Sequence, residues 1–207
     1  DSSGDVSLRS LFNSQTDIDG ESHLDIERLA FLTCRGGWPQ SIKMRDEIAL
    51  DQAFDYYDAV VHSDINRADN ITKNPERVKR LMRSYARNQG GQIPNTVIAR
   101  DIATNDENSI DEETVALYIN ALKKIFVIED MPAWNPNLRS KTAIRSSDTR
   151  YYIDPSIAAA ALGIGPQDLL NDLNTFGFLF ETLCIRDLRV FGNIISTIYV
   201  RVNYGII

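Results

Sequence analysis

The sequence predicts a mainly α, α+β protein. A helical connector (residues 1–70) precedes a winged helix-turn-helix domain (71–153), and C-terminal helices (154–207) end in a β-strand. Three observations predict this order. Apolar residues recur at helical spacing between glycine and proline stops. Three such segments precede the β-prone run 151–153, which is the order of a winged helix. β-Branched residues concentrate in the final stretch, 194–202.

The composition fits a folded protein in a reducing compartment. The chain has 207 residues, of which 43% are hydrophobic and 25% charged. These values are ordinary for a globular protein with a core. Cys34 and Cys184 lie far apart, which excludes a cysteine-rich zinc site and a disulfide scaffold. No apolar run approaches about 18 residues and no signal pattern opens the chain, so we expect a cytoplasmic protein without a membrane partner.

Charge divides the chain into two halves. Residues 1–64 hold 13 acidic and 5 basic side chains, net −8, whereas residues 65–207 hold 16 and 17, net +1; together they give the total of −7. This break predicts two structural units that meet near residues 64–70. The acidic half would repel a phosphate backbone, so any nucleic-acid role belongs to the second half.

The connector is predicted to hold two helices. The first carries the apolar residues Leu24, Ile26, Leu29 and Ala30 and ends at the loop 35–39. Two glycines followed by a residue before proline stop a helix. The second is predicted over 42–62, with Trp38 covering the junction of the two helices. Its expected apolar stripe consists of Leu50, Phe54, Tyr57 and Val61.

The central domain is predicted to hold three helices and a hairpin. Asn74 caps the first helix, Pro75 occupies its first position, and the glycines at 90–91 end it. The second helix spans about 94–103. We expect Ser109 to cap the third, with Glu112 completing a capping box. After this helix, residues 127–153 form the predicted hairpin, or wing.

The C-terminal part is predicted to hold three helices and one strand. Asp154 and Pro155 start an alanine-rich helix that ends at Gly163, and Pro166 opens the next. A longer helix carries Phe180 and continues to about residue 191. An unpaired apolar strand at 194–202 would be an aggregation risk, so we expect it to pair within the protein, to pair with a second copy, or to belong to a sheet that the given residues do not complete.

The sequence carries no recognisable catalytic motif. The phosphate-binding loop, the GxGxxG pattern and the HExxH pattern are absent, and the only histidines are His23 and His62. We therefore expect no catalytic residue, no metal ligand and no cofactor in this chain.

A basic surface is the strongest candidate for binding. Four arginines of the first central helix recur near helical spacing, and the wing adds Arg139, Lys141, Arg145 and Arg150. The acids at 111–113 begin the helix that would enter a major groove, which argues against ordinary DNA reading and leaves a protein partner open. The candidate contact residues are Lys73, Arg77, Lys79, Arg80, Arg83, Arg87, Arg139, Lys141 and Arg145.

The sequence resembles the C-terminal region of a large family of prokaryotic ATP-binding proteins, in which an AAA-type ATPase core precedes a domain of unknown function. The most specific string runs from Val127 to Gly163, and CRGGWP (34–39) and FLFETLCIRDLRVF (178–191) add to it. The resemblance implies an ATPase core before Asp1, which would bind ATP and magnesium and be the natural partner of this chain. It also implies a winged helix followed by the start of a restriction-endonuclease-like fold.

The nuclease-like part of this resemblance concerns Glu181. In such folds this position belongs to a metal site that needs a downstream aspartate and a Glu-x-Lys pair. After Phe191 the sequence contains no Asp, Glu or Lys. We therefore interpret Glu181 as a surface or packing residue and expect no nuclease activity.

Three hypotheses follow from the sequence. The leading one is a non-catalytic accessory or regulatory region of a larger AAA-type ATPase, acting as an interaction module. The first alternative is a DNA-binding winged helix that uses its basic helix and wing. The second is a remnant of a metal-dependent nuclease. Self-association through the terminal strand is compatible with each of them.

Overall fold

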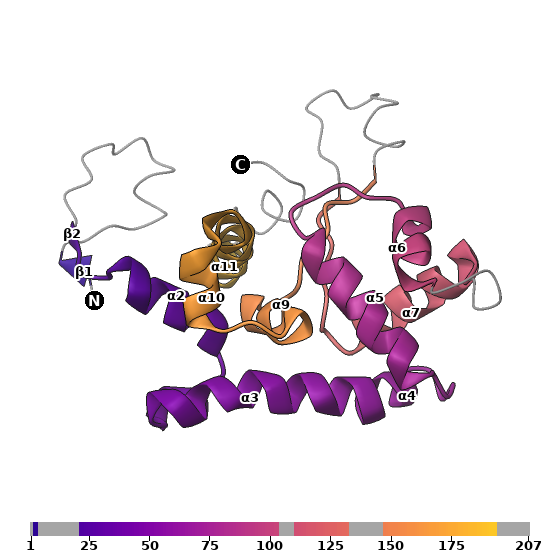
Figure 1. Ribbon diagram of the computed structural model, residues 1–207, viewed down its shortest axis with the longest axis horizontal. Helices are drawn as coiled ribbons and strands as arrows, with labels where there is room; N and C mark the ends of the chain where they lie inside the picture. Colours follow the sequence, from indigo (N-terminus) through magenta and orange to yellow (C-terminus); the bar gives the residue numbers. More distant parts are fainter. Residues whose placement is uncertain (1, 4–20, 104–109, 133–146, 194–207) are drawn as a thin grey trace.

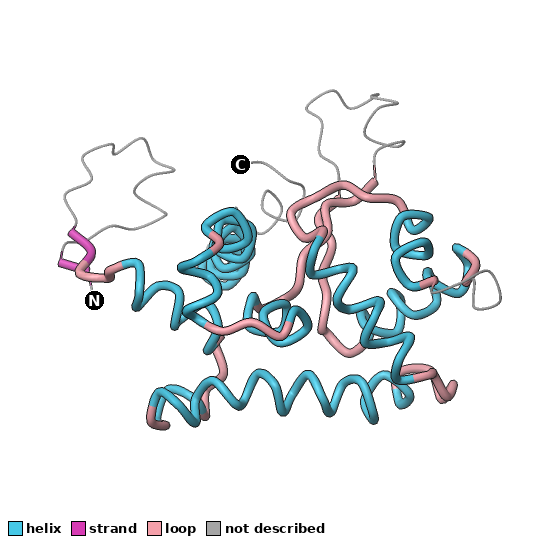
Figure 2. The backbone as a smooth tube through the Cα atoms, in the orientation of Figure 1, coloured by secondary structure: helices cyan, strands magenta, loops and turns pink. Residues whose placement is uncertain are grey.

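The computed structural model describes residues 2–3, 21–103, 110–132 and 147–193, and this part of the chain is mainly helical (Figures 1 and 2). Strands β1 (Ser2–Ser3) and β2 (Glu21–Ser22) pair antiparallel. The helices are α2 (Ile26–Arg35), α3 (Asp46–Ala59), α4 (Ile65–Arg67), α5 (Pro75–Arg87), α6 (Asn95–Ile102), α7 (Glu112–Lys124), α9 (Pro155–Leu162), α10 (Pro166–Asn171) and α11 (Leu173–Asn193). Within these ranges no helix is long and apolar enough to cross a membrane.

Helix α9 is the packing centre of the molecule. Asp154 caps its start and Gly163, with φ +74°, ends it, as predicted. Its residues from Pro155 to Ala161 are all buried, and it packs against α2, α3, α5 and α11. Alanine side chains let four helices approach one short helix closely. Helices from all three predicted domains therefore meet here, while the division into domains stays a prediction.

Helix α3 forms one edge of the molecule (Figure 1). A 3-10 turn over Ser41–Lys43 precedes it, and a π-helical turn over Val60–Asp64 joins it to α4. The predicted apolar stripe was partly wrong, because Phe54 is 41% exposed. The small residues Ala49 and Ala53 face the core instead. Because α3 packs closely against α9, small side chains occupy the buried face of α3. The sequence pattern had instead assigned that face to the large apolar side chains.

The next three helices form a compact group. The caps of α5 are as predicted: the Asn74 side chain accepts hydrogen bonds from the N–H groups of Glu76 and Arg77. For α7 the predicted cap was wrong. Asp111 caps this helix through the N–H of Thr114 at 2.7 Å, whereas Ser109 lies outside the described residues. Asp111 can cap the helix because aspartate is as good an N-cap as serine. The helix therefore begins two residues later than predicted.

Two extended segments follow α7, residues 127–132 and residues 147–153, and we call them the first and second arm. Antiparallel bridges join Ile128 to Tyr152 and Met131 to Thr149. The second arm also bonds to the turn after α5, since the N–H of Gly90 donates to the Arg150 carbonyl at 2.8 Å. The tip of the predicted wing (133–146) and the predicted terminal strand (194–202) lie outside the described residues.

Candidate functional site

Helix α5 separates its side chains into two sharply different faces. Its buried face consists of Val78, Leu81, Met82, Ser84, Tyr85 and Ala86. Three arginines, Arg80, Arg83 and Arg87, are exposed on the other face. They stand at i, i+3 and i+7, which places them along one line of the helix surface. We call these three residues the arginine stripe.

Each arginine of the stripe has a local contact. Arg80 donates to the carbonyl of Ile102 at 3.3 Å. Arg83 lies close enough to Tyr57 to act on its pKa, which burial raises and this guanidinium lowers. Arg87 lies 3.8 Å from Asp101, and its side chain is 64% exposed. The contact of Arg87 is an exposed ion pair, which contributes little to folding, so this guanidinium can exchange Asp101 for a partner.

Two further basic residues of α5 lie beside the stripe and are only half-exposed. Lys79 lies 3.4 Å from Glu76, one turn before it. Arg77 lines a shallow crevice between α5, α6 and α7, formed with Leu81, Ile102, Ile110, Thr114, Val115 and Tyr118. The structure therefore places both residues at the margin of the exposed basic surface.

Lys73 does not join the basic surface. Its side chain is 2% exposed and its Nζ lies 2.5 Å from Asp69. The carbonyls of Ile65 and Ile71 accept further hydrogen bonds from the same Nζ. This ammonium beside Asp69 holds the pKa of that carboxyl below its ordinary value. Lys73 thus closes the turn before α5. The other candidates, Arg139, Lys141 and Arg145, lie outside the described residues.

The arms contain a buried cluster of charges that sequence reasoning missed. Arg150 was predicted to lie on the basic surface, but it is buried and belongs to this cluster. Asp130 accepts hydrogen bonds from Tyr85 and, at 2.7 Å, from Arg150, and lies 2.9 Å from Lys123. Arg150 also donates to the Ile93 carbonyl at 3.1 Å. Burial raises the pKa of Asp130 to about 6. This cluster ties α5, α6 and α7 to the arms and gives the stripe a rigid base.

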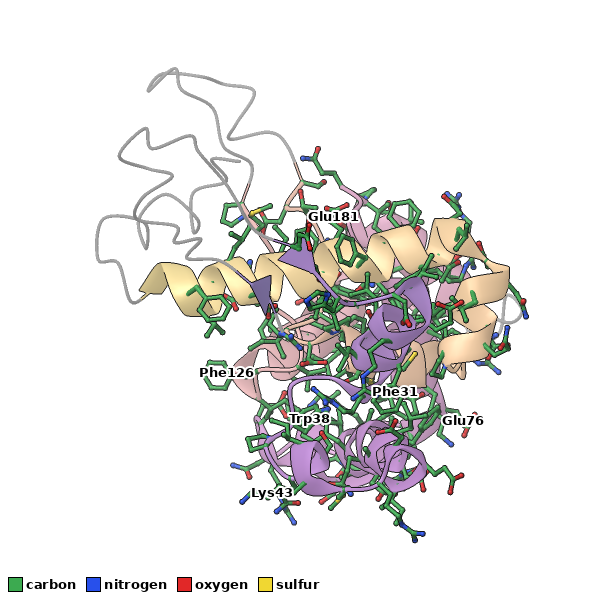
Figure 3. All side chains as sticks on the ribbon, turned by 90° about the vertical axis from the view of Figure 1, so that its left-hand side faces the viewer. Phe31, Trp38, Lys43, Glu76, Phe126 and Glu181 are labelled. Atoms are coloured by element: carbon green, nitrogen blue, oxygen red, sulfur yellow. The ribbon has the colours of Figure 1, made fainter. Side chains whose placement is uncertain are left out.

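Two segments that carry the resemblance to the ATP-binding protein family, residues 34–39 and 127–163, meet in space at the start of α9. The carboxylate of Asp154 accepts hydrogen bonds from the N–H of Gly37 at 2.9 Å and from Arg186 at 2.7 Å. The Trp38 indole donates to Ser156 at 3.0 Å and packs against the Tyr56 ring, with centroids 4.6 Å apart and the rings tilted by 44°. Trp38 therefore covers the junction of α2 and α3, as predicted, and lies between α3 and α11 (Figure 3).

Glu181 projects from the upper side of α11 in the view of Figure 3, and its carboxylate reaches the second arm. It accepts a hydrogen bond from the Tyr151 hydroxyl, and this contact together with burial raises the pKa of Tyr151. Across the part of the chain that the structure describes, no group of three His, Cys, Asp or Glu side chains could hold a metal ion. The arrangement around Glu181 packs α11 against the second arm.

Comparison with known proteins gives a family without an assigned activity. A family model described as Domain of unknown function (DUF8612) matches residues 26–168. This range includes α5, the arms and all of α9. Neither the curated proteins nor the solved structures contain a match.

Proposed function

We propose that this chain, which belongs to the family described as Domain of unknown function (DUF8612), is a non-catalytic interaction module. Its arginine stripe binds an acidic partner surface. The observation that carries this proposal is the division of α5, whose inner face is core and whose outer face presents Arg80, Arg83 and Arg87. A rigid helix that presents regularly spaced guanidinium groups suits the recognition of carboxylates or phosphates.

The rigidity of the stripe supports the proposal. Binding costs less free energy when the contact residues stand on a fixed element. The inner side of α5 is anchored by Tyr85, which bonds to Asp130, and by Met82, whose carbonyl accepts a hydrogen bond from Tyr152 at 2.7 Å. These bonds hold the helix backbone, so the stripe requires no large ordering of its backbone on binding.

The sequence resemblance extends the proposal to a parent protein. In this view the module is an accessory or regulatory region of a larger AAA-type ATPase, and the ATPase core of that protein is one partner. ATP and magnesium would bind to that core and not to this chain. The support is the resemblance of residues 34–39 and 127–163, segments that come together around Asp154.

Binding to labelled poly-L-glutamate, followed by fluorescence anisotropy, tests the proposal. We expect binding at about 0.1 M salt and its loss at about 1 M, where charges are screened beyond about 3 Å. Neutralising Arg83 and Arg87 (R83Q/R87Q) should weaken binding about tenfold, because each exposed charge pair contributes up to about 1 kcal/mol. A matched control, K43Q/R67Q, removes two exposed cations elsewhere. Equal binding by both variants would overturn the proposal.

The alternative partner is duplex DNA. What favours it is the order of three helices followed by two antiparallel arms, which suits a winged helix, together with the stripe on α5. Against it, Glu112 and Glu113 are exposed at the start of α7 and would face phosphates. A labelled duplex in the same titration separates the two. Binding to the duplex that exceeds binding to polyglutamate and is lost in R83Q/R87Q would favour DNA.

A further inference from the structure

Helix α3 carries a surface of opposite sign to the arginine stripe. Glu47, Asp51 and Asp55 are exposed and stand at i, i+4 and i+8, along one side of the helix. We call these three residues the acidic ridge. Helix α3 contains no lysine or arginine that would neutralise it.

Within the acidic ridge, and likewise within the arginine stripe, neighbouring side chains carry like charges that repel one another. Like charges at i and i+4 on a helix are destabilising by about 0.2–0.5 kcal/mol per pair. Among the ion pairs between described residues, none joins a carboxylate of α3 to an arginine of α5. The two α3 carboxylates that do have partners lie at its ends, Asp46 with Arg28 and Asp58 with His62. Within the part of the chain that the structure describes, no ion pair therefore joins the middle of the ridge to a cation.

We infer that the arginine stripe of one molecule binds the acidic ridge of a second copy of this chain. The inference rests on the proposed function of the stripe as a contact surface and names its partner. The charges are complementary and the dimensions match. At 1.5 Å per residue, Glu47 to Asp55 spans about 12 Å and Arg80 to Arg87 about 10 Å. The carboxylates of the ridge can thus meet the guanidinium groups of Arg83 and Arg87 along two helices packed side by side.

Apolar surface beside the ridge adds to the fit. Ile48 is 42% exposed and Phe54 is 41% exposed, and both lie on the same helix as the ridge. The methylene stems of Arg83 and Arg87 can cover such side chains while their charged groups reach the carboxylates. The contact therefore combines ion pairs with modest burial of apolar area.

Net charge sets the conditions for this association. Each molecule carries −7, so two copies repel one another at long range. At about 0.1 M salt the Debye length is about 10 Å, which screens this repulsion while pairs in direct contact persist. Because the two contact surfaces differ, the association either pairs both surfaces reciprocally in a two-fold dimer or runs head-to-tail into a ring or a chain.

Sedimentation velocity on the full chain and on two neutralised variants tests the inference. One variant, D51N/D55N, keeps the stripe and lacks the ridge; the other, R83Q/R87Q, keeps the ridge and lacks the stripe. We expect the unaltered chain to self-associate at about 0.1 M salt and to dissociate at about 1 M. Each variant alone should be monomeric. An equimolar mixture should form a 1:1 complex and stop there, because one usable contact remains.

Control measurements separate this inference from the function on which it rests. The variant K43Q/R67Q should self-associate as the unaltered chain does, and circular dichroism should show the same helix content in every variant. A monomeric unaltered chain at high protein concentration would overturn the inference, as would self-association of either variant alone. If that monomer still binds polyglutamate through the stripe, the proposed function stands and only its partner is wrong.

Discussion

The carboxylate of Asp154 lies 2.7 Å from the guanidinium of Arg186, and through this contact the first turn of α9 is joined to α11. The same carboxylate accepts the N–H of Gly37 and both the N–H and hydroxyl of Ser156. One side chain therefore holds α9, α11 and the turn between α2 and α3. The geometry requires the backbone at residues 36–37 to approach α9 closely, which leads to the first prediction.

Replacing Gly36 with alanine should destabilise the fold strongly. Gly36 has φ +74° and ψ −174°, a region that is essentially restricted to glycine. An added Cβ would lie 2.3 Å from Ser156 Oγ and 2.5 Å from Asp154 Oδ1. We expect a loss of about 3 kcal/mol or more in the free energy of unfolding, measured by urea denaturation.

Gly163→Ala is the matched control for Gly36. Gly163 also has φ +74°, but an added Cβ there meets no atom within 4 Å. Gly163→Ala should lower the free energy of unfolding by about 1 kcal/mol, which is the cost of the left-handed backbone conformation alone. Equal losses in the two variants would show that the close approach to α9 does not matter.

The Asp130 cluster predicts an unusual pH dependence. Burial raises the pKa of Asp130 from 3.8 to about 6, although Arg150 opposes the shift. A second cation, Lys123, lies 2.9 Å from the same carboxylate. Between about pH 4 and pH 6 the folded state therefore holds a proton that the unfolded state has released. By linkage, the stability that Asp130 contributes is largest at low pH and declines as the pH rises through that interval.

Asp130→Asn isolates this effect. We expect the free energy of unfolding of the unaltered chain, minus that of the variant, to fall between about pH 4 and pH 6 and to level off above. Urea denaturation at several pH values measures it, and subtraction removes the contribution of the other carboxyl groups. A difference that grows with pH would mean that the two cations outweigh burial.

Glu181 should behave as a packing residue. In Glu181→Gln the amide oxygen can still accept the hydrogen bond of Tyr151. We expect a change in stability below about 1 kcal/mol and no change in Tm on adding magnesium or manganese to either protein. A metal ion that raises the Tm of the unaltered chain alone, or DNA cleavage that Glu181→Gln abolishes, would establish a nuclease-like site instead.

Local signals in the sequence predicted most of the helix boundaries. Asn74 with Pro75, Asp154 with Pro155, and Gly163 are caps whose chemistry acts within one helical turn, so no knowledge of the fold is required. The junction at Trp38 also followed from local signals, since an aromatic residue beside a helix stop packs against the adjoining helices.

Features that depend on distant partners could not be predicted in this way. The sequence pattern predicted that Lys73 belongs to a basic surface. In the folded chain it is buried, and its Nζ binds Asp69 and two carbonyls. The role of Asp130 in the buried charge cluster could not be predicted, because its partners Tyr85 and Arg150 are distant from it in the sequence. The exposure of Phe54 likewise depends on α9, which packs against α3 only in the folded chain.

The central claim is that the outer face of α5 acts through its charges, while its inner face maintains the fold. The most direct test measures Tm and polyglutamate binding on the same samples of R83Q/R87Q. We predict an unchanged Tm and a roughly tenfold loss of affinity. Unchanged binding, or a Tm that falls together with affinity, would contradict the claim.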